Sequence, residues 1–276
     1  MDSKEQKKSV ILIPVDFTDM TLYAIKQSYN LAKYTHSKLL LLHVYEKQGN
    51  ERYEDITKLA KITQEESGVE TDYMNIKGNI YKEAERIAEE LRAKFIVVGL
   101  ESKMGPKDVF GMSASKLIRE SPCPVISIRG KEHRDGCENI LLPLDLTSYS
   151  RQKVDKAIEM AKYFGASIRV LGVFTSSDEK YENQLHAYAH QVKQYIKSKG
   201  VSCTNKTIES DKIAETVVEY ANKIEADLIM IMTKTDLSVK EFFVGTIAQR
   251  VIDISNIPVL SIRPVKSASV TQGSGF

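Results

Sequence analysis

The sequence predicts an α/β fold: two tandem five-stranded parallel-sheet domains, each with helices on both faces of its sheet. Two observations predict this class. Short apolar runs rich in β-branched residues alternate with amphipathic segments, which requires parallel strands joined by helical crossovers. The chain also repeats itself over a whole domain length, which indicates two copies of one fold rather than a short-period solenoid.

The repeat is clearest where each copy begins and ends. Residues 10–18 are VILIPVDFT and residues 140–147 are ILLPLDLT, and the two segments align through their aspartates at a spacing of 129 residues (145 − 16). Near the ends of the copies, PVISIR (124–129) and PVLSIR (258–263) are 134 residues apart (258 − 124). The larger spacing indicates a net gain of residues in the middle of the second copy.

Composition places the boundaries of the copies. The charged segment GKEHRDGCE is flanked by glycine, and the last residues are small and polar. We therefore predict a first domain at 1–130, a linker at 131–138, a second domain at 139–264 and a disordered tail at 265–276.

Each element of the first copy follows from the spacing of its apolar residues. Buried parallel strands are continuous apolar runs, and Leu22, Ile25 and Tyr29 recur at helical spacing after a plausible N-cap at Thr18 or Asp19. The predicted order is strand 10–15, helix 19–35, strand 38–46, helix 51–67, strand 69–78, helix 79–93, strand 94–99, helix 111–120 and strand 124–129.

The second copy shows the same alternation. The predicted order is strand 138–144, helix 149–164, strand 167–174, helix 178–199, strand 201–209, helix 211–224, strand 227–232, a helix from 245 and strand 258–263.

Composition excludes several classes of protein. A net charge of +2 comes from well-mixed signs, so we expect neither nucleic acid nor a membrane surface as a partner. Three cysteines without CxxC spacing fit a reducing compartment. We see no signal peptide, and the apolar runs are far shorter than the roughly 20 residues of a membrane helix. We therefore expect a cytoplasmic protein.

Asp16 and Asp145 lie one residue past the first strand of each copy. Ligands of open parallel sheets bind beyond the carboxyl ends of the strands, where the strand order reverses. A carboxylate there can accept hydrogen bonds from ribose hydroxyls or an exocyclic amine. It can equally cap the helix that follows, and duplication copies caps as readily as sites.

Several segments resemble the universal stress protein family over nearly all of both copies. They are PVDFT after the first strand, HV at 43–44, Gly78 at the end of the third strand, and VVG…G…SPCPV at the close of the domain. The resemblance implies a tandem two-domain member with ATP as a candidate cofactor. It also implies a nucleotide motif after strand four, Gly-x2-Gly-x9-Gly-[Ser/Thr], whose amides and helix N-terminus bind phosphates.

The first copy departs from that motif. Gly99 supplies the opening glycine, but Ser102 stands at the second position, and the loop to Gly111 is one residue short. The hydroxyl after Gly111 is displaced to Ser113.

The second copy keeps the spacing and the closing Gly245-Thr246, with Lys234 as an added charge, but has Met232 and Thr235 where glycines are expected. A side chain at a position of close approach costs about 1 kcal/mol or more and can block a phosphate.

The candidate nucleotide-binding residues share a place at the carboxyl ends of strands or in the loop after strand four. They are Pro14, Asp16, Val44, Gly99, Gly111 and Ser113 in the first copy, and Pro143, Asp145, Val173, Ile231, Lys234, Thr235, Gly245 and Thr246 in the second.

The residues favour a non-enzymatic, regulatory stress protein with weak or absent ATP binding. The alternative is an ATP- or AMP-binding member with slow ATP hydrolysis. An enzyme of the nucleotide α-hydrolase kind needs a Gly- and Ser-rich loop after strand one, and DFTDMT is not such a loop. We predict no catalytic residue and no metal site, because His186 and His190 have no third ligand nearby in sequence.

The apolar fifth strands predict the association of the copies. The resemblance implies that this edge pairs domains, so we expect an intramolecular pseudo-dimer through the strand-five edges. A homodimer of the full chain is compatible with the sequence, and no protein partner can be named from it.

Overall fold

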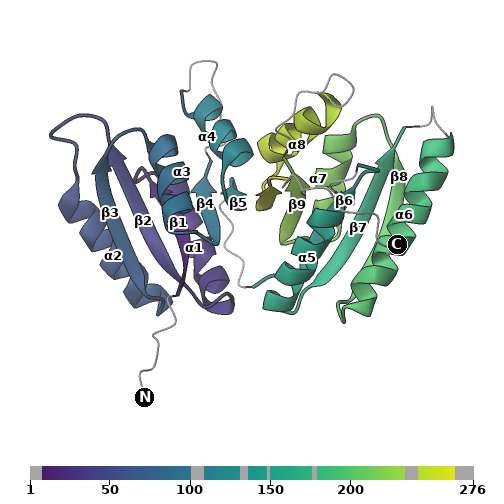
Figure 1. The fold of residues 1–276 in the computed structure, drawn as a ribbon, viewed down its shortest axis with the longest axis horizontal. Coiled ribbons are helices and arrows are strands. Elements are labelled where there is room, and N and C mark those ends of the chain that lie inside the picture. The colour runs from purple at the N-terminus through teal and green to yellow at the C-terminus, as the bar shows by residue number, and fades with distance from the viewer. Residues whose placement is uncertain are drawn as a thin grey trace. The chain divides into compact units, whose positions relative to one another are not determined.

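The computed structural model describes residues 8–100, 109–130, 136–147, 150–175, 179–233 and 242–264 (Figure 1). The chain divides into two compact units between Gly136 and Cys137. Most of the predicted linker (131–135) and the whole predicted tail lie outside the described residues.

The first unit contains nine elements in strict alternation. They are β1 (Ser9–Val15), α1 (Asp19–Tyr34), β2 (Ser37–Tyr45), α2 (Tyr53–Ser67), β3 (Thr71–Lys77), α3 (Ile80–Glu90), β4 (Phe95–Gly99), α4 (Val109–Glu120) and β5 (Val125–Ile128).

The second unit repeats that order. Its elements are β6 (Asn139–Leu144), α5 (Ser150–Phe164), β7 (Ser167–Phe174), α6 (Glu179–Ser198), β8 (Cys203–Glu209), α7 (Ile213–Lys223), β9 (Leu228–Met232), α8 (Phe242–Ile254) and β10 (Val259–Ile262). The predicted α/β class and the order of elements are confirmed.

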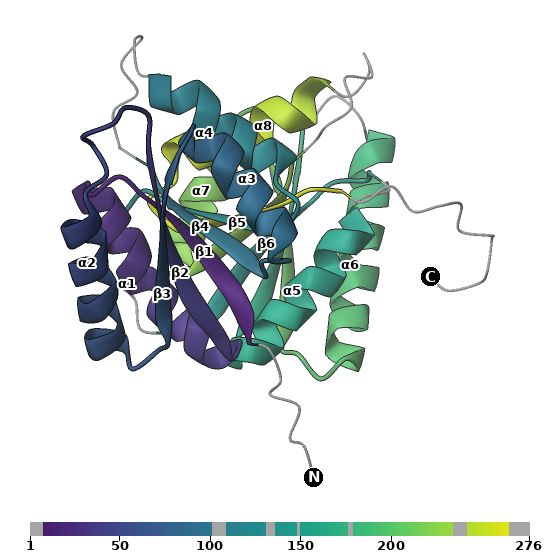
Figure 2. The same ribbon diagram turned by 60° about the vertical axis from the view of Figure 1, so that its left-hand side comes forward.

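Both sheets are parallel and have the same strand order. The first is β3-β2-β1-β4-β5, and the second is β8-β7-β6-β9-β10. In the first unit α1 packs on α2 and α3 packs on α4. Figure 2 shows these two pairs on opposite sides of the sheet. The second unit pairs α5 with α6 and α7 with α8.

The central strands supply the core because both of their faces are covered. The fully buried large side chains include Ile11, Leu12, Ile13, Leu39, Leu41, Leu42, Phe95, Ile96 and Ile140. None of the helices in the described part of the chain is long and apolar enough to cross a membrane.

Two helices begin earlier than predicted. α4 begins at Val109 rather than 111, and α8 at Phe242 rather than 245. Residues 242–244 are Phe-Phe-Val and include no glycine or proline, so α8 can start ahead of Gly245. Gly245 is therefore the fourth residue of α8 rather than its first.

Candidate functional site

The first and fourth strands of each copy separate at their carboxyl ends. β1 pairs with β4 through Ile11–Phe95 and Leu12–Ile96, whereas its pairing with β2 continues to Val15. The second copy repeats this geometry, because β6 pairs with β9 at two positions only. In each copy the strand order reverses between these two strands, which is where such sheets usually bind ligands, and we call this place the crevice of each copy.

Asp16 lies at the rim of the first crevice, and its Oδ1 serves the chain itself. This oxygen accepts hydrogen bonds from the amide of Thr18 (2.9 Å), the hydroxyl of Thr18 (2.7 Å) and the hydroxyl of Thr21. Thr18 in turn caps α1, since its hydroxyl accepts a bond from the amide of Thr21 at 3.4 Å. Of the two predicted caps, Thr18 and Asp19, the structure therefore has Thr18, and Asp16 orients it.

Asp145 repeats the arrangement in the second copy. Its Oδ1 accepts hydrogen bonds from the amide of Thr147 (2.9 Å) and from the hydroxyl of the same residue. Both aspartates thus hold a threonine two residues along, which explains why the sequence repeats aspartate and threonine together.

A tyrosine lies near each aspartate but comes from a different helix in each copy. Burial, and next the charge of Asp16, raise the pKa of Tyr81 of α3 to about 12. Burial and the charge of Asp145 also raise the pKa of Tyr181 of α6. The two crevices are therefore not identical in their polar surroundings.

The β1–α1 loop of the first copy is held by aromatic contacts. Phe17 adopts a left-handed conformation (φ 63°), which is rare for a bulky residue. Its ring meets His43 edge-on at 4.9 Å, and the guanidinium of Arg52 lies 3.9 Å from its centre. His43 Nδ1 is 3.0 Å from the main-chain oxygen of Val15. His43 is thus a structural residue at this rim.

Gly99 is needed for packing. A Cβ atom at Gly99 would lie 2.4 Å from the main-chain oxygen of Met20 and 3.0 Å from the amide of Thr21. The first turn of α1 therefore presses directly onto the end of β4. Met232 closes β9 at the equivalent position, so α5 cannot approach the second sheet in the same way.

Lys153 is the site residue that sequence reasoning missed. It belongs to α5, which packs on β6 and β9, and only 4% of its surface is exposed. Its Nζ donates a hydrogen bond to the main-chain oxygen of Pro143, beyond the last residue pair between β6 and β9. Burial lowers the pKa of this amine below its ordinary 10.5, although the charge of Asp145 opposes the shift. A buried amine thus lies at this place in the second copy.

The signal for Lys153 lay in the comparison of the two copies. At the spacing of 129 residues it aligns with Ala24, which is fully buried in the first copy. A lysine at a position that faces the core in the other copy is a departure that the repeat itself makes visible.

The remaining candidates divide into three groups. Val173 and Ile231 are buried, as is Pro14, while Val44 and Pro143 are half-buried. Gly111 and Ser113 lie in α4, and Gly245 and Thr246 lie in α8. Lys234 and Thr235 lie outside the described residues.

We found no cluster of three or more potential metal ligands in the part of the chain that the structure describes. His186 contacts the hydroxyl of Thr207 at 2.9 Å, and its Nε2 lies 3.5 Å from Glu182.

Comparison with known proteins identifies the family. The model of the universal stress protein family matches the chain twice, at residues 9–129 and 136–263. The chain belongs to the universal stress protein family. It is a tandem member, because the family model matches each copy separately.

Similar proteins agree with this family assignment. A universal stress protein of Methanocaldococcus jannaschii is 26% identical over 143 residues, which cover 47% of this chain and 84% of that protein. The crystal structure of a universal stress protein from Archaeoglobus fulgidus superposes with a TM-score of 0.74 at 15% identity, covering 93% of this chain and 97% of the other. A putative universal stress protein from Pseudomonas aeruginosa gives 0.66 at 18% identity and 93% coverage of both chains. These structures show a shared fold.

Proposed function

We propose that this universal stress protein is a non-enzymatic regulatory protein of the stress response, whose two crevices bind ATP weakly or not at all. The observation that carries the proposal is the buried side-chain amine of Lys153. It lies in the second crevice and donates a hydrogen bond to Pro143. A ligand entering there would have to displace a side chain that already fills the space.

The first crevice supports the same proposal by a different route. Gly99, which resembles the opening glycine of a phosphate loop, is in close contact with the main chain of Met20. Oδ1 of Asp16 already accepts three hydrogen bonds from threonines. Both features use family positions for internal packing rather than for a ligand.

The alternative function is ATP or AMP binding with slow hydrolysis. It is favoured by the second carboxylate oxygen of Asp16, which no described residue hydrogen bonds and which could accept a bond from a ribose hydroxyl. The two proposals differ in the affinity they predict.

Isothermal titration of the full chain with Mg-ATP tests the choice. We expect no saturating heat at submillimolar ATP and no release of phosphate above the uncatalysed rate. Submillimolar binding that is abolished by Asp145→Ala or Gly245→Val would overturn the proposal in the second copy. Binding lost only with Asp16→Ala would place a functional site in the first copy.

We also propose that the two copies associate as a pseudo-dimer through the edges of β5 and β10, in a cytoplasmic protein. The support is the apolar sequence of both strands, VISI and VLSI. Gel filtration of the separated halves tests this idea: stable and fully monomeric halves would contradict it, and cell fractionation tests the location.

A further inference from the structure

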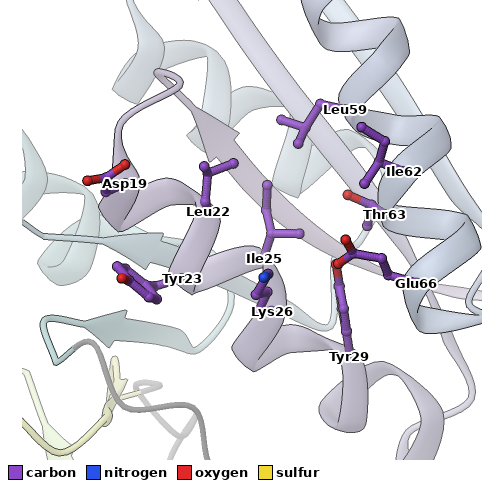
Figure 3. Close-up of a pocket in the computed structure, with 10 residues that line it drawn as sticks. All are labelled: Asp19, Leu22, Tyr23, Ile25, Lys26, Tyr29, Leu59, Ile62, Thr63 and Glu66. Atoms are coloured by element: carbon purple, nitrogen blue, oxygen red, sulfur yellow. The ribbon is translucent and has the colours of Figure 1, made fainter.

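The first copy carries an open groove between α1 and α2, with a volume of about 390 Å³. Figure 3 shows the ten lining side chains, with Leu22 and Ile25 of α1 facing Leu59 and Ile62 of α2. At one end the hydroxyl of Tyr29 donates to Glu66 at 3.2 Å. The groove is therefore apolar along its length and closed by a polar contact at one end.

The apolar surface here is unusual within the molecule. Leu22 and Ile62 are each 39% exposed. The exposed large hydrophobic residues of the described chain all belong to the first copy, and they are Leu22, Tyr34, Tyr53, Ile62 and Tyr73. Apolar residues that gather along a groove, rather than scatter singly, are typical of an interaction surface.

The second copy differs at the same positions. Arg151 aligns with Leu22, and Asp155 aligns with Lys26, at the spacing of 129 residues. Asp155 accepts a hydrogen bond from the hydroxyl of Tyr195 at 2.9 Å, which joins α5 to α6. The second copy thus differs at two of the groove positions, and its residues there provide the variants for a test.

Two opposite charges flank the apolar centre of α1. Asp19, Leu22 and Lys26 follow one another at intervals of three and four residues, so they share one face of the helix. Neither Asp19 nor Lys26 has an ion-pair partner among residues 8–100 or the other described ranges. Each charge lies about 5 Å along the axis from a point between Leu22 and Tyr23.

This arrangement is self-complementary. If a second α1 lies antiparallel and is centred on that point, Asp19 of each helix meets Lys26 of the other, and Leu22 of each helix lies close to the axis. A two-fold contact between identical chains requires a self-complementary surface. If residue i of one chain contacts residue j of the other, then residue j of the first chain also contacts residue i of the second.

We propose that this groove is the contact by which two copies of the chain associate about a two-fold axis, with Leu22 of each copy entering the α1–α2 groove of the other. The exposed leucine and isoleucine supply the apolar contact. The paired charges fix the antiparallel direction. Association through this face is independent of any nucleotide and of the edges of β5 and β10.

Sedimentation analysis of the full chain over a range of concentrations tests the proposal. The variants are Leu22→Arg and Lys26→Asp, which introduce the residues of the second copy, together with Asp19→Lys and the double variant Asp19→Lys/Lys26→Asp. Lys58→Asp, at an exposed position of α2 outside the groove, is the matched control. Circular dichroism confirms that each variant is folded.

We expect a reversible dimer whose dissociation constant rises at least tenfold in each single variant and is unchanged in Lys58→Asp. The double variant restores the alternation of charge and is expected to return within threefold of the wild type. A monomeric wild type at all concentrations would overturn the proposal and assign the groove to a different occupant. A dimer insensitive to the single variants, or a double variant as weak as the singles, would also overturn it.

Discussion

Lys153 donates a hydrogen bond to the main-chain oxygen of Pro143, at the position where the first copy has the small, buried Ala24. The two copies therefore differ at this position by a buried amine in the second and a methyl group in the first. The predictions that follow concern this contact and three others.

Lys153→Met tests the electrostatic state of the second crevice. The folded pKa of Lys153 lies below its ordinary 10.5, so between these two values the unfolded chain binds more protons than the folded one. The free energy of unfolding of the wild type, relative to the variant, should therefore rise as the pH increases toward 10.5. Denaturant titrations from pH 8 to 10 measure this difference, with Lys58→Met as an exposed control. A difference that does not change with pH would show that the amine is as well solvated as in the unfolded chain.

Asp16→Ala removes the oxygen that orients the cap of α1. We expect a loss of about 1–3 kcal/mol in the free energy of unfolding, because hydrogen bonds to a charged acceptor are lost and buried donors are left unmet. Asp16→Asn should lose less, since the amide oxygen still accepts a bond from Thr18. Urea unfolding measures both variants. Equal losses would mean that charge, rather than the hydrogen bonds, is what matters at this rim.

Gly99→Ala tests the close approach of α1 to β4. The added carbon would meet the main-chain oxygen of Met20, which cannot move without displacing the helix, so we expect a destabilisation of about 1–3 kcal/mol. Gly172→Ala is the matched control, since its added carbon meets the side chains of Leu185 and Thr207 at 3.0 Å. Side chains can yield where main chain cannot, and thermal unfolding should rank the two variants in that order. A tolerated Gly99→Ala would restore a ligand-related reason for this glycine.

Tyr29→Phe tests the polar contact that closes the α1–α2 groove. Burial, and then the charge of Glu66, raise the pKa of Tyr29 from 10.0 to about 12. Between these values the folded protein keeps a proton that the unfolded chain releases, so the wild type loses stability as the pH rises through this window. The phenylalanine variant should lose less, as measured by unfolding at pH 9 to 11. Tyr73→Phe, at an exposed position of β3, controls for the loss of a phenol. If the free energy of unfolding depended on pH in the same way in both variants, the contact between Tyr29 and Glu66 would not be the cause.

The order of the elements could be predicted because the same alternation of apolar and amphipathic segments occurs in both copies. Apolar runs such as LLLL in β2 and LIMIM in β9 show buried parallel strands directly. Residue type and position predicted the cap of α1 as Thr18 or Asp19, and the structure has Thr18. The starts of α4 and α8 were predicted two or three residues too late, because helix boundaries are marked only by weak local signals.

The site could be located but not described from the sequence. Asp16 and Asp145 were predicted at the rim, yet their role as acceptors for Thr18 and Thr147 depends on loop geometry that one sequence does not show. The conformation of Phe17 could not be foreseen, because a bulky residue rarely adopts a positive φ. Lys153 on its own has the pattern of an exposed helical lysine, and its burial follows only from the tertiary packing of α5.

The contact between Gly99 and Met20 also limits how this duplicated chain can change. The similar sequences of the two halves could recombine. A crossover that placed α1 on β9 would, however, press the main chain of α1 against the side chain of Met232, which stands at the position of Gly99. A chimera that places α1 on a sheet therefore has to bring β4 with it. In this respect the two halves are no longer interchangeable.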